Sequence, residues 1–242
     1  MTGPRLLALW SAPRSRSTAF LRMMAERGDY TVVHEPFSQV VDFGRVMVGE
    51  REVRDEAAAI AALRALSTRA PVFFKDTTDF AFPGVLADAD FLAETTHTFI
   101  IRHPGEAIAS HFALNPGLER DEIGFARLAA LYDAVTEAAG APPVVIDSDD
   151  LIERPVETVR SYCRLVGLDF RAEALSWRPG LRAEWRRTRR WHEATSRTDS
   201  FVRTARAYAD TTDNNPVLAG YLDYHLPFYE RLHAHRMIIE PA

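Results

Sequence analysis

Five short apolar segments alternate with segments of helical periodicity, and this alternation constrains the fold more than any other feature of the chain. The short segments are apolar throughout, as in strands that are buried on both faces. Strands alternating with helices predict an α/β fold in which a parallel sheet is flanked by helices. The expected strands are Leu6–Trp10, Thr31–His34, Val72–Phe74, Thr98–Ile101 and Val144–Ile146, and the expected helices cover about 18–27, 55–66, 105–114, 120–139 and 155–166.

The loops that follow these strands are the expected place for a ligand. In an open parallel sheet, ligands bind beyond the carboxyl ends of the strands, where each strand leads into the next helix. Every such loop in this chain carries charged side chains, which favours a binding site over ordinary polar strand ends. The loops are 11–17, 35–37, 75–79, 102–105 and 147–150.

Composition limits the class of ligand and the compartment. The chain has 242 residues, a net charge of −5 and no apolar run long enough to span a bilayer. We therefore expect a cytoplasmic protein without nucleic-acid or membrane partners. A single cysteine, Cys163, excludes an internal disulfide and is expected to be a buried thiol. Lys75 is the only lysine among 29 basic residues, so its compact ammonium is a candidate functional group.

Residues 11–18, with the sequence SAPRSRST, join the first strand to the first helix and are suited to binding an anion. A helix N-terminus offers unpaired backbone N–H groups, and the Arg14 guanidinium matches the geometry of phosphate oxygens. The loop has neither lysine nor glycine, which argues against the Walker A and dinucleotide-binding patterns. An N-cap role for Ser17 or Thr18 would explain one hydroxyl and leave Arg14 and Arg16 unexplained.

Three stretches resemble motifs of the sulfotransferase superfamily, enzymes that transfer a sulfonate group from 3′-phosphoadenosine 5′-phosphosulfate to an acceptor. Residues 13–20, PRSRSTAF, resemble the loop that binds the 5′-phosphosulfate, with Arg14 in place of the lysine of cytosolic relatives. Residues 101–110, IRHPGEAIAS, resemble the 3′-phosphate motif, in which a helical serine follows an arginine by eight positions. Residues 144–167 are similar to the family's strand and proline-started helix.

The resemblance implies a P-loop-NTPase-like sulfotransferase fold with a core over about residues 5–170 and the phosphosulfate nucleotide as co-substrate. The sequence departs from the family at Arg16, where relatives usually have glycine, and at 148–151, where SDDL replaces Tyr-Glu-Asp-Leu and the tyrosine by the adenine is lost. The residues expected to bind the donor are Arg14, Ser15, Arg16, Ser17, Thr18, Arg102, Ser110 and Arg190.

Direct sulfonate transfer needs a base for the acceptor proton and cations near the leaving phosphate, without a metal. Glu35 is the first candidate for the base, because its Glu-Pro step resembles carbohydrate and bacterial sulfotransferases; a structural salt bridge is the alternative. Asp76 is the second candidate, and Arg14 and Lys75 are the expected catalytic cations. Histidine spacing gives no indication of zinc. Three histidines rank below the carboxylates as bases: His34, His103 and His111.

Residues 177–200 are rich in arginine and tryptophan and show no strand pattern. They are interpreted either as a solvated helical face or as a mobile lid that closes arginines over an anionic ligand. In the absence of repeats and linkers, one domain is expected over 1–242, with a lid-like and helical part at about 177–242.

The sequence therefore predicts a sulfotransferase that acts on a hydroxyl or amine of a small-molecule acceptor. A kinase-like phosphoryl transferase and a non-catalytic nucleotide-binding protein are the alternatives. The acceptor pocket is expected to be formed by residues 37–55, 78–96 and 177–200.

Overall fold

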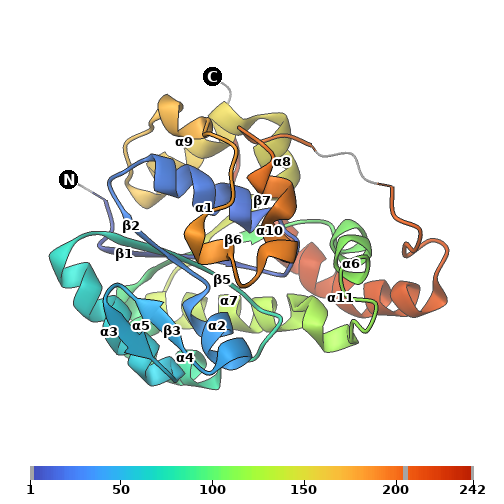
Figure 1. Cartoon of the computed structure of the whole chain (residues 1–242), viewed down its shortest axis with the longest axis horizontal. Helices are drawn as coiled ribbons and strands as arrows, with labels where there is room; N and C mark the ends of the chain where they lie inside the picture. The colour runs from blue at the N-terminus through green and yellow to red at the C-terminus, as the bar shows by residue number, and fades with distance from the viewer. Residues whose placement is uncertain (1–2, 204–206, 241–242) are drawn as a thin grey trace.

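A five-stranded parallel sheet forms the centre of the protein, in a computed structural model that describes residues 3–203 and 207–240. Its order is β2-β5-β1-β6-β7, so β1 lies in the middle and pairs with β5 and β6 (Figure 1). All five predicted strands are present. Their bounds are β1 (Leu6–Ser11), β2 (Thr31–His34), β5 (Val72–Thr77), β6 (Thr96–Ile101) and β7 (Val144–Asp147).

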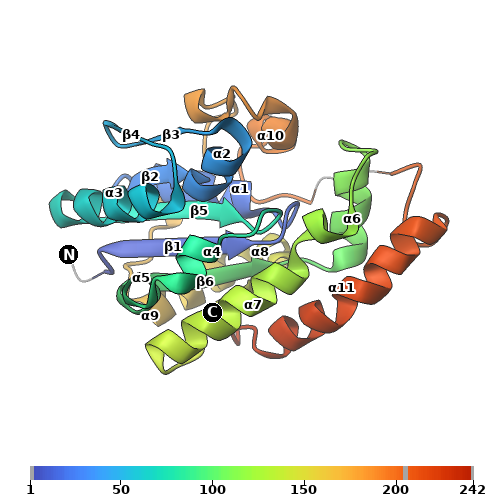
Figure 2. The same ribbon diagram turned by 90° about the horizontal axis from the view of Figure 1, so that it is seen from below.

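Helices cover both faces of the sheet, as Figures 1 and 2 show. Side chains of β1 alternate between two cores, because successive residues of a strand point to opposite faces. Leu7 and Leu9 pack against a first set of helices on one face, and Ala8 and Trp10 pack against a second set on the other face. The predicted α/β class is therefore confirmed. The first set is α1 (Ser17–Glu26), α8 (Ser148–Glu153) and α9 (Pro155–Val166), and the second is α3 (Glu56–Arg69), α5 (Ala89–Glu94) and α7 (Phe125–Ala139).

Strand β5 is longer than its apolar pattern. Lys75, Asp76 and Thr77 continue the strand in register with residues 9–11 of β1, and all three are buried. The prediction that a loop begins at Lys75 was wrong, because apolar periodicity ends at Phe74 whereas the ladder of backbone hydrogen bonds to β1 does not. Two ionisable side chains thus lie inside the carboxyl end of the sheet.

The helix expected at about 105–114 is α6, and further elements lie between the predicted ones and after residue 170. The helix α11 packs on α6 and α7, beside the carboxyl end of the sheet (Figure 2). It contains Pro227 and lies within the segment, about 177–242, that is expected to be lid-like and helical. The elements are α2 (Pro36–Phe43), β3 (Val46–Val48), β4 (Arg51–Val53), α4 (Pro83–Ala87), α6 (Pro104–Phe112), α10 (Arg189–Ser196) and α11 (Pro216–Ala234), with 3-10 turns at Arg120–Ile123, Ala172–Leu175 and Ala183–Trp185.

Two smaller expectations concern single properties of the chain. Cys163, on α9, is a free and buried thiol, as predicted. Within 3–203 and 207–240, the helices all fall short of the combination of length and apolar character that crossing a bilayer requires.

Trp10 anchors the aromatic part of the core, where its ring packs against Phe37, Phe74 and Phe82 and its Nε1 donates to Nδ1 of His97 at 2.8 Å. We expect Trp10→Ala to lower the free energy of unfolding by about 3–5 kcal/mol, because it leaves a large cavity in a dry core. Chemical denaturation measures this change. Val217→Ala, at a half-exposed position of α11, is the control and should change stability by less than about 0.5 kcal/mol.

Candidate active site

A cleft of about 270 Å³ opens at the carboxyl ends of β1, β2, β5 and β6. The loop between β1 and α1 forms its floor, and α2, α6 and α10 contribute to its walls. This is the edge at which the sequence places a ligand. The cleft-lining residues that the sequence singles out are Arg14, Arg16, Ser17, Thr18, Glu35, Lys75, Arg102, Ser110, His111 and Arg190.

The loop between β1 and α1 has a strained backbone. Arg14 and Arg16 both adopt left-handed conformations, with φ of 66° and 65°. Such a conformation is costly for a residue with a Cβ atom, and at functional sites this strain serves to fix backbone geometry. Ser11 Oγ and Ser17 Oγ lie 2.9 Å apart and tie the two ends of the loop together.

The N-terminus of α1 faces this loop without a side-chain cap. Arg16 occupies the N-cap position, and no described side chain accepts a capping hydrogen bond there. The alternative that Ser17 or Thr18 serves as an N-cap is therefore wrong. The first amides of α1 keep their donor capacity for a ligand. Ser15 Oγ is also buried and has no hydrogen-bond partner in the described part of the chain.

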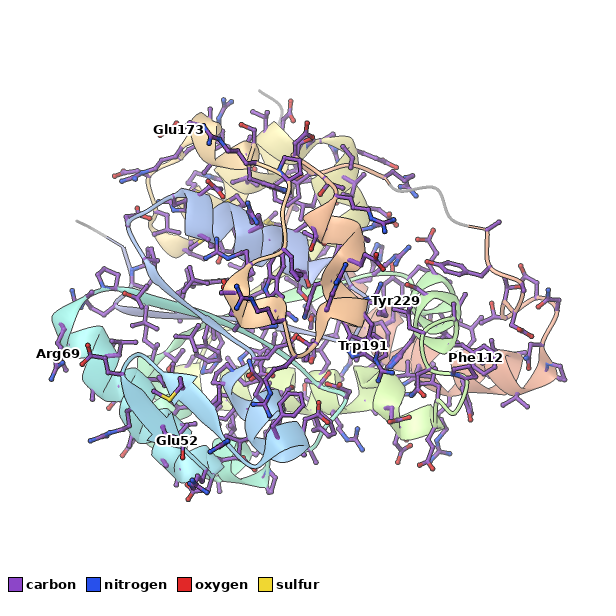
Figure 3. All side chains as sticks on the ribbon, viewed as in Figure 1. Glu52, Arg69, Phe112, Glu173, Trp191 and Tyr229 are labelled. Carbon is purple, nitrogen blue, oxygen red and sulfur yellow. The ribbon has the colours of Figure 1, made fainter. Side chains whose placement is uncertain are left out.

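Arg14 joins three separate elements at the cleft. Its Nε donates to Ser110 Oγ on α6 at 3.1 Å, and its Nη1 donates to the backbone oxygen of Trp191 on α10 at 2.7 Å. The two motifs identified in the sequence, the β1–α1 loop and the Arg102–Ser110 pair, thus meet through Arg14. Figure 3 labels Trp191 where α10 approaches α6, and the Trp191 ring packs edge-on against His111 of that helix.

Arg102 and Arg16 share one carboxylate. Glu106 Oε2 accepts from Arg102 Nε at 2.9 Å and Nη2 at 2.6 Å, and it lies 3.4 Å from Arg16 Nη2. Arg102 Nη1 also donates to the backbone oxygen of Arg14 at 3.1 Å. Glu106 therefore aligns two guanidinium groups before any ligand arrives. This pre-organisation lowers the conformational entropy that ligand binding would cost.

Arg16 adopts the left-handed backbone conformation that favours glycine, and its side chain is held towards the β7 side of the cleft. Its Nη1 donates to Asp149 Oδ1 at 2.6 Å and to Ser148 Oγ at 3.1 Å. The SDDL stretch that departs from the family pattern thus supplies partners for the arginine that also departs from it. The loop accommodates Arg16 by pairing its side chain with α8 rather than by close backbone approach.

Glu35 and Lys75 form a buried ion pair at the ends of β2 and β5. Glu35 is left-handed, with φ of 47°, and it is the residue before α2. Burial alone would raise the pKa of Glu35, but the adjacent His34 and Lys75 outweigh it and lower the pKa. Since burial lowers the pKa of His34 to about 4, Lys75 supplies the positive charge at neutral pH. Glu35 is therefore ionised in this state.

Asp76 does not reach the cleft. Its carboxylate accepts from the Phe37 amide at 2.7 Å and the Thr77 amide at 2.9 Å, and it also binds Ser38, whose hydroxyl lies 2.5 Å away. Burial raises the pKa of Asp76 to about 7 against the opposing effect of these donors. The structure thus gives the second candidate base a different position, in which it anchors the first turn of α2.

His192 was missed by the sequence prediction and lies at the centre of the cleft wall. Its Nδ1 is 3.2 Å from Thr18 Oγ1, and its Nε2 is 3.2 Å from His34 Nε2. Burial lowers the pKa of His192 to about 3, so its ring is neutral. A neutral imidazole has one donor and one acceptor nitrogen and can link Thr18 to His34. No motif marked it, because its partners lie far away in the sequence.

The segment 177–200 packs several ring side chains on the protein, while most of its arginines are exposed. Trp177, Trp185 and His192 are buried, and the Trp185 ring stacks on His192 at 5.3 Å. Helix α10 packs against α1, and Arg190 lines the cleft with its guanidinium over the Trp191 ring. The exposed arginines fit the interpretation as a solvated face, and the packing of α10 against α1 fits a lid, whose movement stays a prediction.

His103 takes a structural position, whereas His111 lines the cleft beside Trp191. His103 Nδ1 accepts from the Gly105 amide at 3.2 Å and caps α6. Burial and then Arg14 lower the pKa of His111 to about 3. Among the described residues, His34, Glu35 and His192 bring potential metal-ligand atoms within 4.8 Å of one another. Glu35 is already paired with Lys75, however, so the Lys75 ammonium would repel a metal cation bound there.

Comparison with known families matches residues 5–236 to the sulfotransferase domain. The chain therefore belongs to the sulfotransferase family, which confirms the resemblance seen in its motifs. It is 27% identical over 241 residues to branched-chain-amino-acid aminotransferase-like protein 2 of Arabidopsis thaliana, and over 188 residues to protein 1 of the same name. These matches cover 93% and 74% of this chain but only 41% and 33% of the plant proteins, so the chain spans less than half their length.

The fold is also that of a known sulfotransferase structure. The sulfotransferase from Alicyclobacillus acidocaldarius aligns with a TM-score of 0.51 at 16% identity, over 98% of both chains. This likeness concerns the fold alone, and it confirms the predicted sulfotransferase architecture.

His192 should hold α10 onto the β1–α1 loop. We expect His192→Ala to raise amide hydrogen exchange in α10 by about tenfold or more, which corresponds to about 1.4 kcal/mol of local stability, because Thr18 and His34 both lose their partner. Exchange in α9 should stay unchanged. The exposed His235 provides the control variant His235→Ala. Exchange of α10 at the original rate in His192→Ala would contradict this anchoring role.

Proposed function

We propose that the protein transfers a sulfonate group from 3′-phosphoadenosine 5′-phosphosulfate to a small-molecule acceptor. The observation that carries this proposal is the convergence of Arg14, Arg102 and Ser110 at the uncapped N-terminus of α1. Two phosphate-binding motifs, more than 80 residues apart in the sequence, thereby face one cleft. A donor with phosphate groups at both its 5′ and 3′ positions would use both.

The β1–α1 loop is suited to the 5′-phosphosulfate. The free amides of α1 and the guanidinium of Arg14 supply donors on one side, and Lys75 supplies an ammonium from the end of β5. Each such electrostatic contact to a leaving phosphate is worth about 2–4 kcal/mol of barrier in a water-excluded site. Arg102 and Ser110, on the far side of Arg14, are suited to the 3′-phosphate.

Glu35 is the proposed general base. The acceptor oxygen or nitrogen would attack sulfur, the bond from sulfur to the bridging oxygen would break, and adenosine 3′,5′-bisphosphate would leave with the electron pair. Glu35 would take the acceptor's proton. While Lys75 pairs with it, Glu35 is a weak base, because that ammonium lowers its pKa. If the ammonium shifts towards the leaving phosphate, the same movement strengthens the base and stabilises the leaving group.

Donor binding tests the proposal directly. Calorimetry should show that adenosine 3′,5′-bisphosphate binds more tightly than adenosine 5′-phosphate, which lacks the 3′ group. We expect Arg102→Ala to weaken the bisphosphate by about 10- to 100-fold, since a charge-assisted contact of about 1.5–3 kcal/mol is lost, and the monophosphate by less than threefold. The control is Arg120→Ala, because Arg120 is an exposed arginine paired with Asp121 outside the cleft.

Two results would overturn the assignment of the donor. The first is preferential binding of ATP with magnesium, which would favour a phosphoryl transferase. The second is equal binding of the two adenosine nucleotides to the unchanged protein, which would leave Arg102 and Ser110 without a 3′-phosphate to bind.

Catalysis itself is tested at Glu35. We expect Glu35→Gln to reduce turnover by at least about 100-fold, because the proton acceptor is lost, while affinity for the bisphosphate changes by less than about threefold. Product is followed by mass spectrometry, and a melting curve shows whether the buried Lys75 still permits folding. Glu52→Gln, on the exposed β4, is the control. Turnover that survives in a folded Glu35→Gln variant would exclude Glu35 as the base.

A further inference from the structure

The cleft has two halves of opposite charge. The half beside α1, α6 and α10 contains Arg14, Arg16, Arg102 and Arg190. The other half is formed by the segments that follow β2 and β5 and by the turn at 120–123, and it contains no arginine among its lining residues in the described chain. Its lining residues are Ser38, Gln39, Asp42, Phe43, Thr77, Asp79, Phe80, Asn115 and Glu122.

Asp79 is the unusual member of this second half. Its Oδ1 is buried and receives no hydrogen bond within the part of the chain that the structure describes. A buried carboxylate oxygen without a donor is destabilising by about 1–3 kcal/mol, so its persistence calls for an explanation, and a bound cation or a functional role is one. Asp79 lines the cleft and follows β5, the strand that carries Lys75.

The neighbouring cations are already bound to other groups. Lys75 pairs with Glu35, and Arg127 donates to the backbone oxygens of Asp79 and Asp121 rather than to the Asp79 carboxylate. Burial and then the negative charge of Glu35 raise the pKa of Asp79 to about 6, against the opposing effect of hydrogen bonds from Thr77 and from the amide of Asp79 itself. Burial and the charge of Glu35 both disfavour the ionised carboxylate, and both effects would be relieved by a positive charge placed beside it.

We propose, resting on the sulfotransferase function above, that the acceptor carries a cationic ammonium group, which binds Asp79 while a hydroxyl of the same molecule faces Glu35. The acceptor class is thus an amino alcohol or an amino phenol. A neutral polyol would satisfy Asp79 with one hydrogen bond but would leave the negative charge of this half of the cleft uncompensated.

Two aromatic rings fit the same class of acceptor. Phe80 follows Asp79 directly and lines the cleft, so its ring is available to an organic cation or to the carbon skeleton that carries it. Phe43 lies on α2, and the Arg187 guanidinium lies over its ring, with Cζ 3.9 Å from the ring centroid. That contact shows that a ring at this edge of the cleft accommodates positive charge.

The separation of the two carboxylates gives them separate tasks. Glu35 is held by Lys75 at the junction with the donor half, where the reacting oxygen must lie. Asp79 stands on the acceptor half and has no hydrogen-bonded connection to the described donor-binding residues. An ammonium at Asp79 would therefore orient the acceptor without neutralising the base, and the distance between the acceptor's two groups would select among amines.

Matched probes test this proposal on the whole chain saturated with adenosine 3′,5′-bisphosphate. Tyramine is compared with 4-ethylphenol, and 2-aminoethanol with 1-propanol, by ligand-observed NMR titration. We expect each amine to bind about tenfold or more tightly than its uncharged analogue. Asp79→Asn should remove this preference without weakening the uncharged analogues. Asp79→Glu, which keeps the charge, should retain part of it.

The control is Asp223→Asn, at an exposed acid of α11 that does not line the cleft. Absence of any amine preference in the unchanged protein, including failure of both amines to bind, would overturn the proposal. An amine preference that survives in a folded Asp79→Asn variant would also overturn it. Failure of the bisphosphate itself to bind would count against the sulfotransferase donor instead, so the two failures are distinguishable.

Discussion

The parallel pairing of β1 with both β5 and β6 is the constraint on which the rest of the site depends. Because all three strands run in one direction, their carboxyl ends meet at one edge of the sheet. The loop that carries Arg14, the end of β5 that carries Lys75 and the start of α6 near Arg102 are thereby neighbours. Residues that lie as far apart as Arg14 and Ser110 come within hydrogen-bonding distance without any long loop.

Strain is concentrated at the same edge. Among the residues that the structure describes, Arg14, Arg16 and Glu35 are the non-glycine residues with left-handed φ, and all three line the cleft. Each is held there by contacts of its side chain: Arg14 with Ser110, Arg16 with Asp149 and Glu35 with Lys75. Two ion pairs and one hydrogen bond therefore stabilise backbone geometry that local preference opposes. Stability and function are coupled at these three positions, because a change of side chain alters the backbone as well.

Much of the fold was predictable, because buried parallel strands are apolar along their whole length and leave a clear signal. The end of β5 was not predicted, because Lys75 and Asp76 are not apolar. Their burial in the strand depends on partners at the end of β2 and the start of α2, which no local pattern reveals. The β1–α1 loop and the Arg102–Ser110 spacing were visible, since each is a short motif. The position of His192 was not, because it depends on how α10 folds back onto α1. Asp76 was expected at the site because it follows Lys75 in the sequence. Successive strand residues point to opposite faces, however, and only Lys75 reaches the cleft.

The use of a single lysine at the ion pair has a chemical consequence. A chain with one lysine has one side-chain ε-amine, and here that amine is 2% exposed beneath the cleft. The surface of the protein therefore presents arginine side chains, but no lysine side chain, to amine-reactive reagents. Acylation of that one nitrogen would require the cleft to open and the Glu35 carboxylate to release its partner. The rate of such labelling would then follow a single motion of the molecule, without the background that surface lysines create in other proteins.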